Sequence, residues 1–303
     1  MHKEIPERPP VGVIGLGLMG TALCERLLTD GYPVIVYNRT RAKATRLIAN
    51  GAEWSDNPFA VCDRIVMCLY TTDVVEETLE AFADALRPGT IVIDTTTGDP
   101  QRMDHLGNWL AAHGVEYLEA PISGSSEQTR RHLSTALAAG SKEAFEACRD
   151  ILDCLAAKTY FVGGWGNGIR MKLVTNLVLG LNRAALAEGL AFSKSIGLSM
   201  EDALTVLLNS PAYSRTMDAK GPKMVAGDFA PQAKLSQHLK DVQLILDEAL
   251  RGGKTLPLSA VHKRLLDRAV DERLGELDNS VIFRILDESW ASKSASDDCA
   301  KPT

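Results

Sequence analysis

The chain has 303 residues, 45% of them hydrophobic, and a formal net charge of −6. This length is enough for about two globular domains, each with an apolar core of its own. Acidic and basic residues are intermixed rather than gathered in blocks, so a nucleic-acid-binding face and a polybasic membrane segment are excluded. We therefore expect a small-molecule partner.

Several features indicate a cytoplasmic protein without disulfides or a metal site. Met1 to Pro10 lack the apolar core of a secretory signal. The apolar stretch Leu173 to Phe192 contains Asn176, Arg183 and Glu188, which a membrane span would not tolerate cheaply. The six cysteines form no C-x-x-C pair, as expected of free thiols in a reducing compartment: Cys24, Cys62, Cys68, Cys148, Cys154 and Cys299.

The N-terminal half alternates runs rich in Val and Ile with amphipathic stretches, a pattern that predicts βαβ units and a mostly parallel sheet. The run Ile65 to Leu69 has no polar alternation, as expected where helices cover both faces of a sheet. We predict a doubly wound, Rossmann-like domain over residues 1–164. Its expected strands are Val11–Gly15, Val34–Tyr37, Ile65–Leu69, Ile91–Asp94, Val115–Leu118, Thr135–Ala139 and Thr159–Val162.

After Gly163 to Gly166 helical periodicity dominates, so we predict an all-α domain over residues 165–303 for substrate binding and oligomerisation. Gly168 to Ser195 contain no proline and predict one axial helix, roughly 40 Å long. The polar tail from Ser292 to Thr303 is expected to be disordered. Further helices are expected at Ser199–Asn209, Lys234–Leu250 and Leu258–Arg273, with Pro211, Pro222 and Pro257 between them.

A glycine-rich loop follows the first predicted strand and opens a helical pattern, as the dinucleotide-binding fingerprint requires. The loop is Gly15-Leu16-Gly17-Leu18-Met19-Gly20. Its first glycine permits a tight turn, the second lets the backbone approach the pyrophosphate, and the third allows the helix to pack closely. The phosphates then bind at the helix N-terminus.

The turn after the second predicted strand indicates NADP(H) rather than NAD(H). It reads Tyr37-Asn38-Arg39-Thr40 and has no carboxylate to bind the ribose 2′-hydroxyl of NAD. Arg39, Thr40, Arg41 and Lys43 instead supply cations and a hydroxyl suited to a 2′-phosphate. Arg46 is interpreted as part of a solvated helix face.

Lys172 and Asn176 are four residues apart on the predicted axial helix and therefore share a face. A lysine at the start of an apolar helix that faces a cleft is suited to acid/base work when desolvation lowers its pKa. Read from this spacing alone, an ordinary solvated lysine is the stronger interpretation.

The motifs, taken in order, resemble those of the β-hydroxyacid dehydrogenase family, which includes 3-hydroxyisobutyrate dehydrogenases, tartronate semialdehyde reductases and glyoxylate or succinic semialdehyde reductases. The resemblance covers Val11 to Leu286. Besides the glycine loop, four segments match: Asp94-Thr95-Thr96-Thr97-Gly98-Asp99-Pro100, Glu119-Ala120-Pro121-Ile122-Ser123-Gly124, Gly166-Asn167-Gly168 with Lys172 and Asn176, and Lys240-Asp241.

The resemblance implies interconversion of a small β-hydroxy acid and its semialdehyde or keto acid, with Lys172 as general acid/base. It implies that Asn176 orients the substrate and that Ser123 and Gly124 hold its carboxylate. Thr97 and Lys240 are expected at the nicotinamide, and Leu69 and Tyr70 over the cofactor, with packing as the alternative for Tyr70. A homodimer or homotetramer, as in the family, also fits Leu177, Leu181 and Leu190, which exceed the apolar needs of one small domain.

The sequence departs from the family pattern at Ser125, where the family has a second glycine in the carboxylate loop. A side chain there is expected to narrow or polarise the substrate pocket. Arg130, Arg131 and His132 follow; we interpret them as solvated loop residues, with contact to a second anionic substrate group as the alternative. The substrate itself is not determined by the sequence.

Two other functions stay open. One is an imine reductase-like enzyme of the same superfamily, against which Lys172 argues, because those enzymes typically replace the lysine. The other is a catalytically silent NADPH-binding scaffold protein, which would be expected to lose that lysine. A 6-phosphogluconate dehydrogenase is set aside because Thr175 stands where those enzymes have a histidine.

Overall fold

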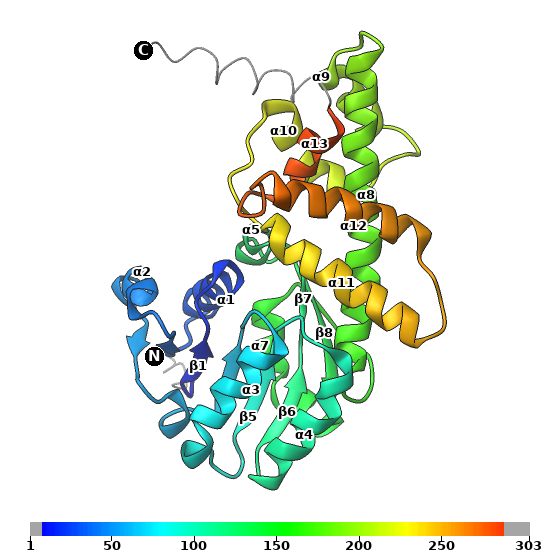
Figure 1. Cartoon of the computed structure of the whole chain (residues 1–303). Helices are drawn as coiled ribbons and strands as arrows, with labels where there is room; N and C mark the ends of the chain where they lie inside the picture. Colours follow the sequence, from blue (N-terminus) through cyan, green and yellow to red (C-terminus); the bar gives the residue numbers. More distant parts are fainter. Residues whose placement is uncertain (1–7, 288–303) are drawn as a thin grey trace, which may run out of the picture. The chain divides into compact units, whose positions relative to one another are not determined.

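The structure, a computed structural model, describes residues 8–287; the tail for which disorder was expected lies outside them. The chain divides into two units between Lys172 and Leu173, and each unit is described by itself (Figure 1). The predicted domain limits at residues 164 and 165 stay a prediction.

The first unit is built on a sheet with the order β3-β2-β1-β4-β5-β6-β8-β7, and β9 pairs with β8. Strands β1 to β6 pair with one another in parallel, β8 is antiparallel to β6 and β7, and β9 is parallel to β8. The predicted Rossmann-like, mostly parallel sheet is confirmed. The strands are β1 Val11–Ile14, β2 Val34–Tyr37, β3 Glu53–Trp54, β4 Arg64–Met67, β5 Ile91–Asp94, β6 Glu116–Glu119, β7 Ile122–Ser123, β8 Thr135–Gly140 and β9 Lys158–Phe161.

Helices cover both faces of this sheet, because successive side chains along each strand point to opposite sides. Val66 and Leu118 share a core with Leu23 of α1 and Leu155 of α7. On the other face the hydroxyl of Tyr117 contacts α4. The helices are α1 Leu18–Thr29, α2 Thr45–Ala49, α3 Thr72–Ala81, α4 Met103–Ala112, α5 Ser126–Arg130, α6 Lys142–Ala147 and α7 Arg149–Leu155, with 3-10 turns η1 Arg41–Ala44, η2 Pro58–Ala60, η3 Ala83–Ala85 and η4 Pro100–Arg102.

The second unit is helical throughout its described part, residues 173–287, as predicted. Its axis is α8, which begins at Asn167 in the first unit and runs without interruption to Ser195 (Figure 1). Leu186 and Leu190 of α8 share a core with Val242, Leu266 and Phe283. The other helices are α9 Met200–Leu208, α10 Arg215–Ala226, α11 Leu235–Arg251, α12 Pro257–Asp271, η5 Asn279–Val281 and α13 Ile282–Leu286.

Helix α10 corrects the prediction that Pro222 separates helices, because this proline lies inside it. A proline in a helix interior removes one backbone hydrogen bond, which is normally unfavourable. Here the helix is held by burial of Met217, Lys220 and Met224 along one face. Tertiary packing therefore outweighs the local propensity.

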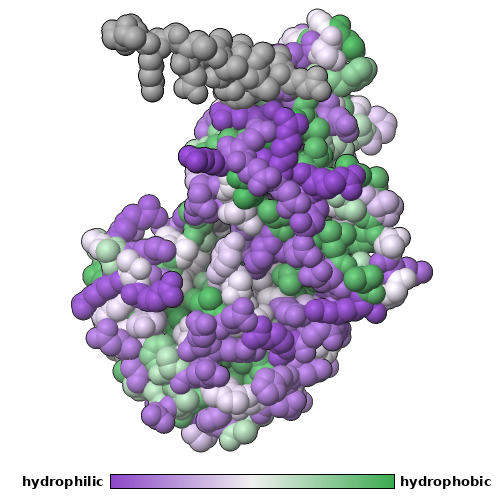
Figure 2. All heavy atoms as spheres, in the orientation of Figure 1, coloured by the Kyte–Doolittle hydropathy of each residue, from purple (hydrophilic) through white to green (hydrophobic). Residues whose placement is uncertain are grey.

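The long helix α8 presents an exposed apolar stripe in the second unit, made by Val174, Val178 and Phe192 and continued by Ile196 just after its end; all four are 52–62% exposed. Figure 2 shows apolar surface among the helices of the second unit. Leu190 is fully buried in the core of its own unit and is therefore not a surplus apolar residue.

Three further features concern the expectations about membrane spans, disulfides and metal sites. Among residues 8–287, no helix combines the length and apolarity that crossing a membrane requires. The five cysteines in this range are all free thiols, and burial raises the pKa of each, for example that of Cys24 to about 12. The same range contains no group of three or more His, Cys, Asp or Glu side chains placed to hold a metal ion.

Candidate active site

The glycine loop connects β1 to α1, and the surroundings of each glycine match its predicted role. Gly15 has φ +97°, a conformation that side chains rarely adopt, and a Cβ at Gly20 would collide with the carbonyl oxygen of Gly15. Gly17 precedes α1 and has no atom within 4 Å of the position a Cβ would take. The loop is therefore tight at both ends and open in the middle, as a pyrophosphate at a helix N-terminus requires.

Asn38 joins this loop to the turn that was predicted to bind the 2′-phosphate. Its Oδ1 accepts a hydrogen bond from the backbone N–H of Leu16 at 2.9 Å, and its Nδ2 donates to the carbonyl oxygen of Thr40 at 3.0 Å. Arg39, Thr40 and Lys43 are exposed. The side chain of Asn38 thus connects the backbone of the glycine loop to that of the turn after β2.

The other cations near that turn have structural contacts. The guanidinium of Arg41 lies over the ring of Trp54, 5.1 Å from its centroid. Arg46 pairs with Glu25, which fits its interpretation as a helix-face residue. Arg39 and Lys43 have no such side-chain partner among the described residues.

The ends of β4 and β5 form the next part of the site. The backbone N–H of Leu69 donates to the hydroxyl of Thr96 at 3.0 Å, and Thr96 N donates to the Asp94 carboxylate at 2.8 Å. The Tyr117 hydroxyl donates to the same carboxylate. Burial raises the pKa of Asp94, although these donors oppose the shift. Tyr70 is half exposed. Thr97 was the residue predicted here, whereas Thr96 and Asp94, which fix the segment, were given no role.

Lys172 lies in the second turn of α8 and is almost fully buried, with 6% of its surface exposed. Its Nζ donates a hydrogen bond to the carbonyl oxygen of Ile122 at 2.7 Å. Ser123 and Gly124 follow Ile122 directly. The structure therefore brings the predicted acid/base residue to the segment that was predicted to hold the substrate carboxylate.

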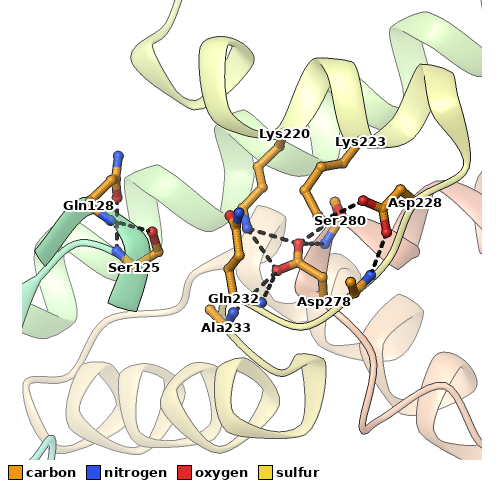
Figure 3. Close-up of polar contacts among 10 residues, drawn as sticks. Ser125, Gln128, Lys220, Lys223, Asp228, Gln232, Ala233, Asp278 and Ser280 are labelled. Carbon is orange, nitrogen blue, oxygen red and sulfur yellow. Dashed lines mark hydrogen bonds and ion pairs between the residues drawn. The ribbon is translucent and has the colours of Figure 1, made fainter. Parts of the chain in front are cut away.

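Ser125 has a local structural role that the family pattern did not reveal. It is the N-cap of α5: its hydroxyl accepts from the backbone N–H of Gln128 at 3.2 Å, and its own N–H donates to Gln128 Oε1 at 2.8 Å (Figure 3). This reciprocal pair is a capping box. The side chain that replaces the family's glycine is therefore engaged at the start of a helix.

The residues after the cap also make intramolecular contacts. Arg130 Nε donates to Glu25 of α1 at 2.6 Å, and Arg131 pairs with Glu127 at 3.6 Å. His132 has a positive φ of 53° and its Nε2 lies 2.9 Å from the carbonyl oxygen of Asp153. These contacts support a structural interpretation of the three residues.

Within the second unit, Asn176 and Lys240 meet at one carboxylate. Asn176 Nδ2 donates to Asp241 Oδ2 at 2.8 Å, and Lys240 Nζ lies 3.5 Å from Asp241 Oδ1. Asp241 is buried. Asp241 was not predicted as a site residue, although its position beside Lys240 in the matched motif was the available signal.

Comparison with protein-family models accounts for nearly all of the described chain. Residues 10–164 match the NAD binding domain of 6-phosphogluconate dehydrogenase. Residues 166–286 match the model described as NAD-binding of NADP-dependent 3-hydroxyisobutyrate dehydrogenase. Both parts of the chain are therefore similar to nicotinamide-dinucleotide-binding domains.

Two curated relatives differ in kind. Glyoxylate/succinic semialdehyde reductase 1 of Arabidopsis thaliana is 30% identical over 282 residues, which cover 90% of this chain and 96% of the relative. The cytokine-like nuclear factor N-PAC of Xenopus tropicalis is 29% identical over 286 residues, 92% of this chain but only 54% of that protein. The chain thus spans nearly the whole of the reductase and about half of N-PAC.

Solved structures agree with the fold. A 3-hydroxyisobutyrate dehydrogenase from Salmonella typhimurium superposes with a TM-score of 0.85 at 26% identity, covering 92% of this chain and all of that one. Psf3, solved with NADP+ and 2-OPP, has a TM-score of 0.85 at 29% identity, covering 91% and 99%. An imine reductase from Pseudomonas sp., at 24% identity and a TM-score of 0.64 over 92% and 99%, shares the fold.

Proposed function

Since the chain belongs to the β-hydroxyacid dehydrogenase family of NAD(P)-dependent oxidoreductases, we propose that it interconverts a small β-hydroxy acid and its semialdehyde or keto acid with NADP(H). The observation that carries this proposal is the bond from Lys172 Nζ to the carbonyl oxygen of Ile122. It holds a buried proton donor beside Ser123 and Gly124. Reduction of a carbonyl group needs such a donor next to the groups that bind the substrate.

The proposed chemistry divides the work between the coenzyme and the side chains. NADP(H), when bound, supplies or accepts the hydride. In reduction, Lys172 gives a proton to the carbonyl oxygen of the substrate, and in oxidation it takes the hydroxyl proton back. Ser123 and the backbone N–H of Gly124 hold the substrate carboxylate. Asn176 orients the substrate, and its bond to Asp241 fixes the direction of its amide.

The preference for NADP(H) rests on the turn after β2. The exposed Arg39, Thr40 and Lys43 offer donors to a 2′-phosphate, and no carboxylate occupies the turn to bind a free 2′-hydroxyl. The likeness to Psf3, solved with NADP+, supports the same preference. Leu69, Tyr70, Thr97 and Lys240 remain the predicted contacts at the nicotinamide end.

The experiment that tests this function is an NADPH oxidation assay against short carboxylated aldehydes, including glyoxylate and succinic semialdehyde. We expect turnover with at least one of them. Lys172→Ala should lower kcat by about 10²–10⁴-fold, because it removes a general acid. NADPH binding, followed by the quenching of protein fluorescence, should stay unchanged.

The matched control is Lys158→Ala, which removes an exposed lysine of β9 in the same unit. It should leave kcat and coenzyme affinity at wild-type values. A Lys172→Ala enzyme that keeps its turnover would refute the role of this lysine.

The likeness to N-PAC keeps one alternative in view, a silent NADPH-binding scaffold protein, because that relative is named as a nuclear factor rather than as an enzyme. Tight NADPH binding without oxidation by any aldehyde of the panel would favour it. An imine reductase-like activity is the other alternative; faster turnover of a cyclic imine than of every carboxylated aldehyde would favour that one.

We also propose that the protein is a homodimer or homotetramer of the cytoplasm. The exposed apolar stripe of α8 supports self-association, because three large apolar side chains on the helix and Ile196 just after it are unfavourably exposed to water.

A further inference from the structure

A buried carboxylate links the sheet of the first unit to the start of α8. Glu119, the last residue of β6, is 1% exposed. Its Oε1 accepts a hydrogen bond from the backbone N–H of Gly166, and its Oε2 accepts from that of Ile169 at 3.2 Å. The first N–H groups of a helix have no acceptor within the helix, and a negative charge beside them is favourable. Glu119 therefore caps α8 from a strand that lies far away in the sequence.

Gly168 makes this contact possible. A Cβ at this position would lie 2.8 Å from the carbonyl oxygen of Leu137 and 3.0 Å from Glu119 Oε2. Only a residue without a side chain lets the first turn of α8 approach β6 and β8 this closely. The second glycine of the Gly166-Asn167-Gly168 segment thus serves the capping contact.

Lys172 is held at both of its ends by this arrangement. Its backbone follows Ile169 by three residues, so the bond from Ile169 to Glu119 fixes the turn from which the lysine side chain leaves. Its Nζ is bound to the carbonyl oxygen of Ile122, three residues after Glu119 in the chain. The Glu119 carboxylate and the Lys172 ammonium group thus both connect the start of α8 to residues 119–122.

We propose that Glu119 is a positioning residue, whose carboxylate holds the first turn of α8 so that Lys172 is presented beside Ser123. This inference rests on the proposed function, in which Lys172 is the general acid/base. Glu119 acts through the helix backbone, since both of its bonds go to backbone N–H groups.

The protonation of Glu119 should control this contact near neutral pH. Burial raises its pKa to about 7, opposed by the bonds from Gly166 and Ile169 and reinforced by Asp94. The titratable groups that interact with it are Asp94 on β5, which raises its pKa, Arg170 on α8, which lowers its pKa, and Tyr117 on β6. Protonation removes the negative charge and turns one oxygen into a hydroxyl, which is a weaker acceptor, so the two N–H groups are held less tightly. Turnover should therefore fall as the pH drops through about 7.

The test compares Glu119→Gln with the wild type in the NADPH oxidation assay, across about pH 6 to 9. We expect kcat at pH 8 to fall by at least about tenfold, because a small misplacement of a catalytic group is costly. The KM for NADPH should stay within about twofold, since the coenzyme loop is untouched, and the fall of kcat near pH 7 should disappear. Glu116→Gln, on the exposed side of the same strand, is the matched control and should behave as wild type.

Thermal unfolding gives a second readout. A folded-state pKa of about 7, above the ordinary 4.5, means that the folded protein binds more protons than the unfolded chain between these values. Stability from this group is then full below about pH 4.5 and is lost as the pH rises through about 7. Because Glu119→Gln carries no such proton, its Tm relative to wild type should rise between about pH 5 and pH 8.

Several results would overturn the inference: wild-type kcat in Glu119→Gln, a kcat loss that keeps the fall near pH 7, or a Tm difference that does not change with pH. If Glu119→Gln does not bind NADPH, Glu119→Asp replaces it; this variant keeps the charge and should retain part of kcat and the fall near pH 7. A flat wild-type kcat from about pH 6 to 8 would also overturn the inference. If Lys172→Ala is as active as wild type, the proposed function fails instead, whatever Glu119→Gln does.

Discussion

At the scale of single residues, the structure distinguishes the four neighbouring cations that follow β2, of which only Arg46 was set apart by the sequence. Arg41 lies over the ring of Trp54 and Arg46 pairs with Glu25, so both side chains already have intramolecular partners in the absence of a coenzyme. Arg39 and Lys43 are exposed at the turn itself. Of these two, Arg39 directly follows the Asn38 anchor, which makes it the better candidate for a 2′-phosphate ligand.

The prediction at this scale concerns coenzyme selectivity. Arg39→Ala should raise the KM for NADPH by about 10–100-fold, as expected when a hydrogen bond between two charged groups is lost. The KM for NADH should change little, because NADH has no 2′-phosphate. Arg46→Ala is the control and should leave both values near wild type. If the wild type already used NADH as well as NADPH, the assignment of Arg39 would be wrong.

At the scale of elements, α10 illustrates how a buried charge pair fixes a helix that its sequence disfavours. Lys220 Nζ lies 2.8 Å from Asp278 Oδ1, and Asp278 also accepts hydrogen bonds from Gln232, Ala233 and Ser280 (Figure 3). Burial disfavours the Asp278 carboxylate, but Lys220 and these donors outweigh it and hold its pKa below the ordinary value. One side chain thus joins α10 to η5 and to the segment before α11.

We therefore expect Lys220→Ala to destabilise the helical unit by about 3–5 kcal/mol, because it leaves a buried carboxylate without its cation. Lys223→Ala, one turn further along the same helix, removes an ion pair to the exposed Asp228 and should leave Tm close to wild type. Urea unfolding of the full chain, followed by circular dichroism, measures both. Equal losses in the two variants would contradict the special role of the Lys220 pair.

How far the elements could be predicted depended on how much local signal each one carries. The strands with continuous apolar runs, such as Ile91–Asp94, were predicted correctly. Strands β3 and β7 have two residues each, too few to show a period, and were missed. Helix α10 was not predicted because Gly221 and Pro222 have low helix propensity. The helix is stabilised instead by tertiary contacts of its buried face.

Residues of the candidate site also divide into those with a local sequence signal and those without one. The glycine loop is a local motif that its strand and helix context indicates, and Lys172 and Asn176 were indicated by the resemblance of their motif to that of the family, since spacing alone favoured a solvated lysine. Glu119 belongs to a matched motif, but its partners Gly166 and Ile169 lie some 50 residues away. No local pattern indicates that a strand residue caps a distant helix. Asp241 was missed for the same reason, since its bond to Asn176 spans 65 residues.

At the scale of the whole molecule, the exposed stripe of α8 predicts self-association. Val178→Lys combined with Phe192→Lys should shift the protein towards the mass of one chain, 32.8 kDa, in light scattering after size exclusion. Both positions are more than half exposed, so the charges should not disturb the fold of the unit. Val61→Lys, at a similarly exposed valine of the first unit, is the control. A monomeric wild type, or a double variant with wild-type mass, would contradict the proposed oligomer.

The two hydrogen bonds of the Asn38 side chain have a consequence for the design of coenzyme selectivity in this fold. Because one amide holds both Leu16 in the phosphate loop and Thr40 in the selectivity turn, the two regions cannot be redesigned independently through that residue. A carboxylate at position 39 should favour the ribose 2′-hydroxyl of NAD(H) over the 2′-phosphate of NADP(H), while the glycine loop that binds the diphosphate keeps its shape. Replacing Asn38 should lower the affinity for NADH and for NADPH to a similar extent. The useful design rule is to vary position 39 and to keep its neighbour constant.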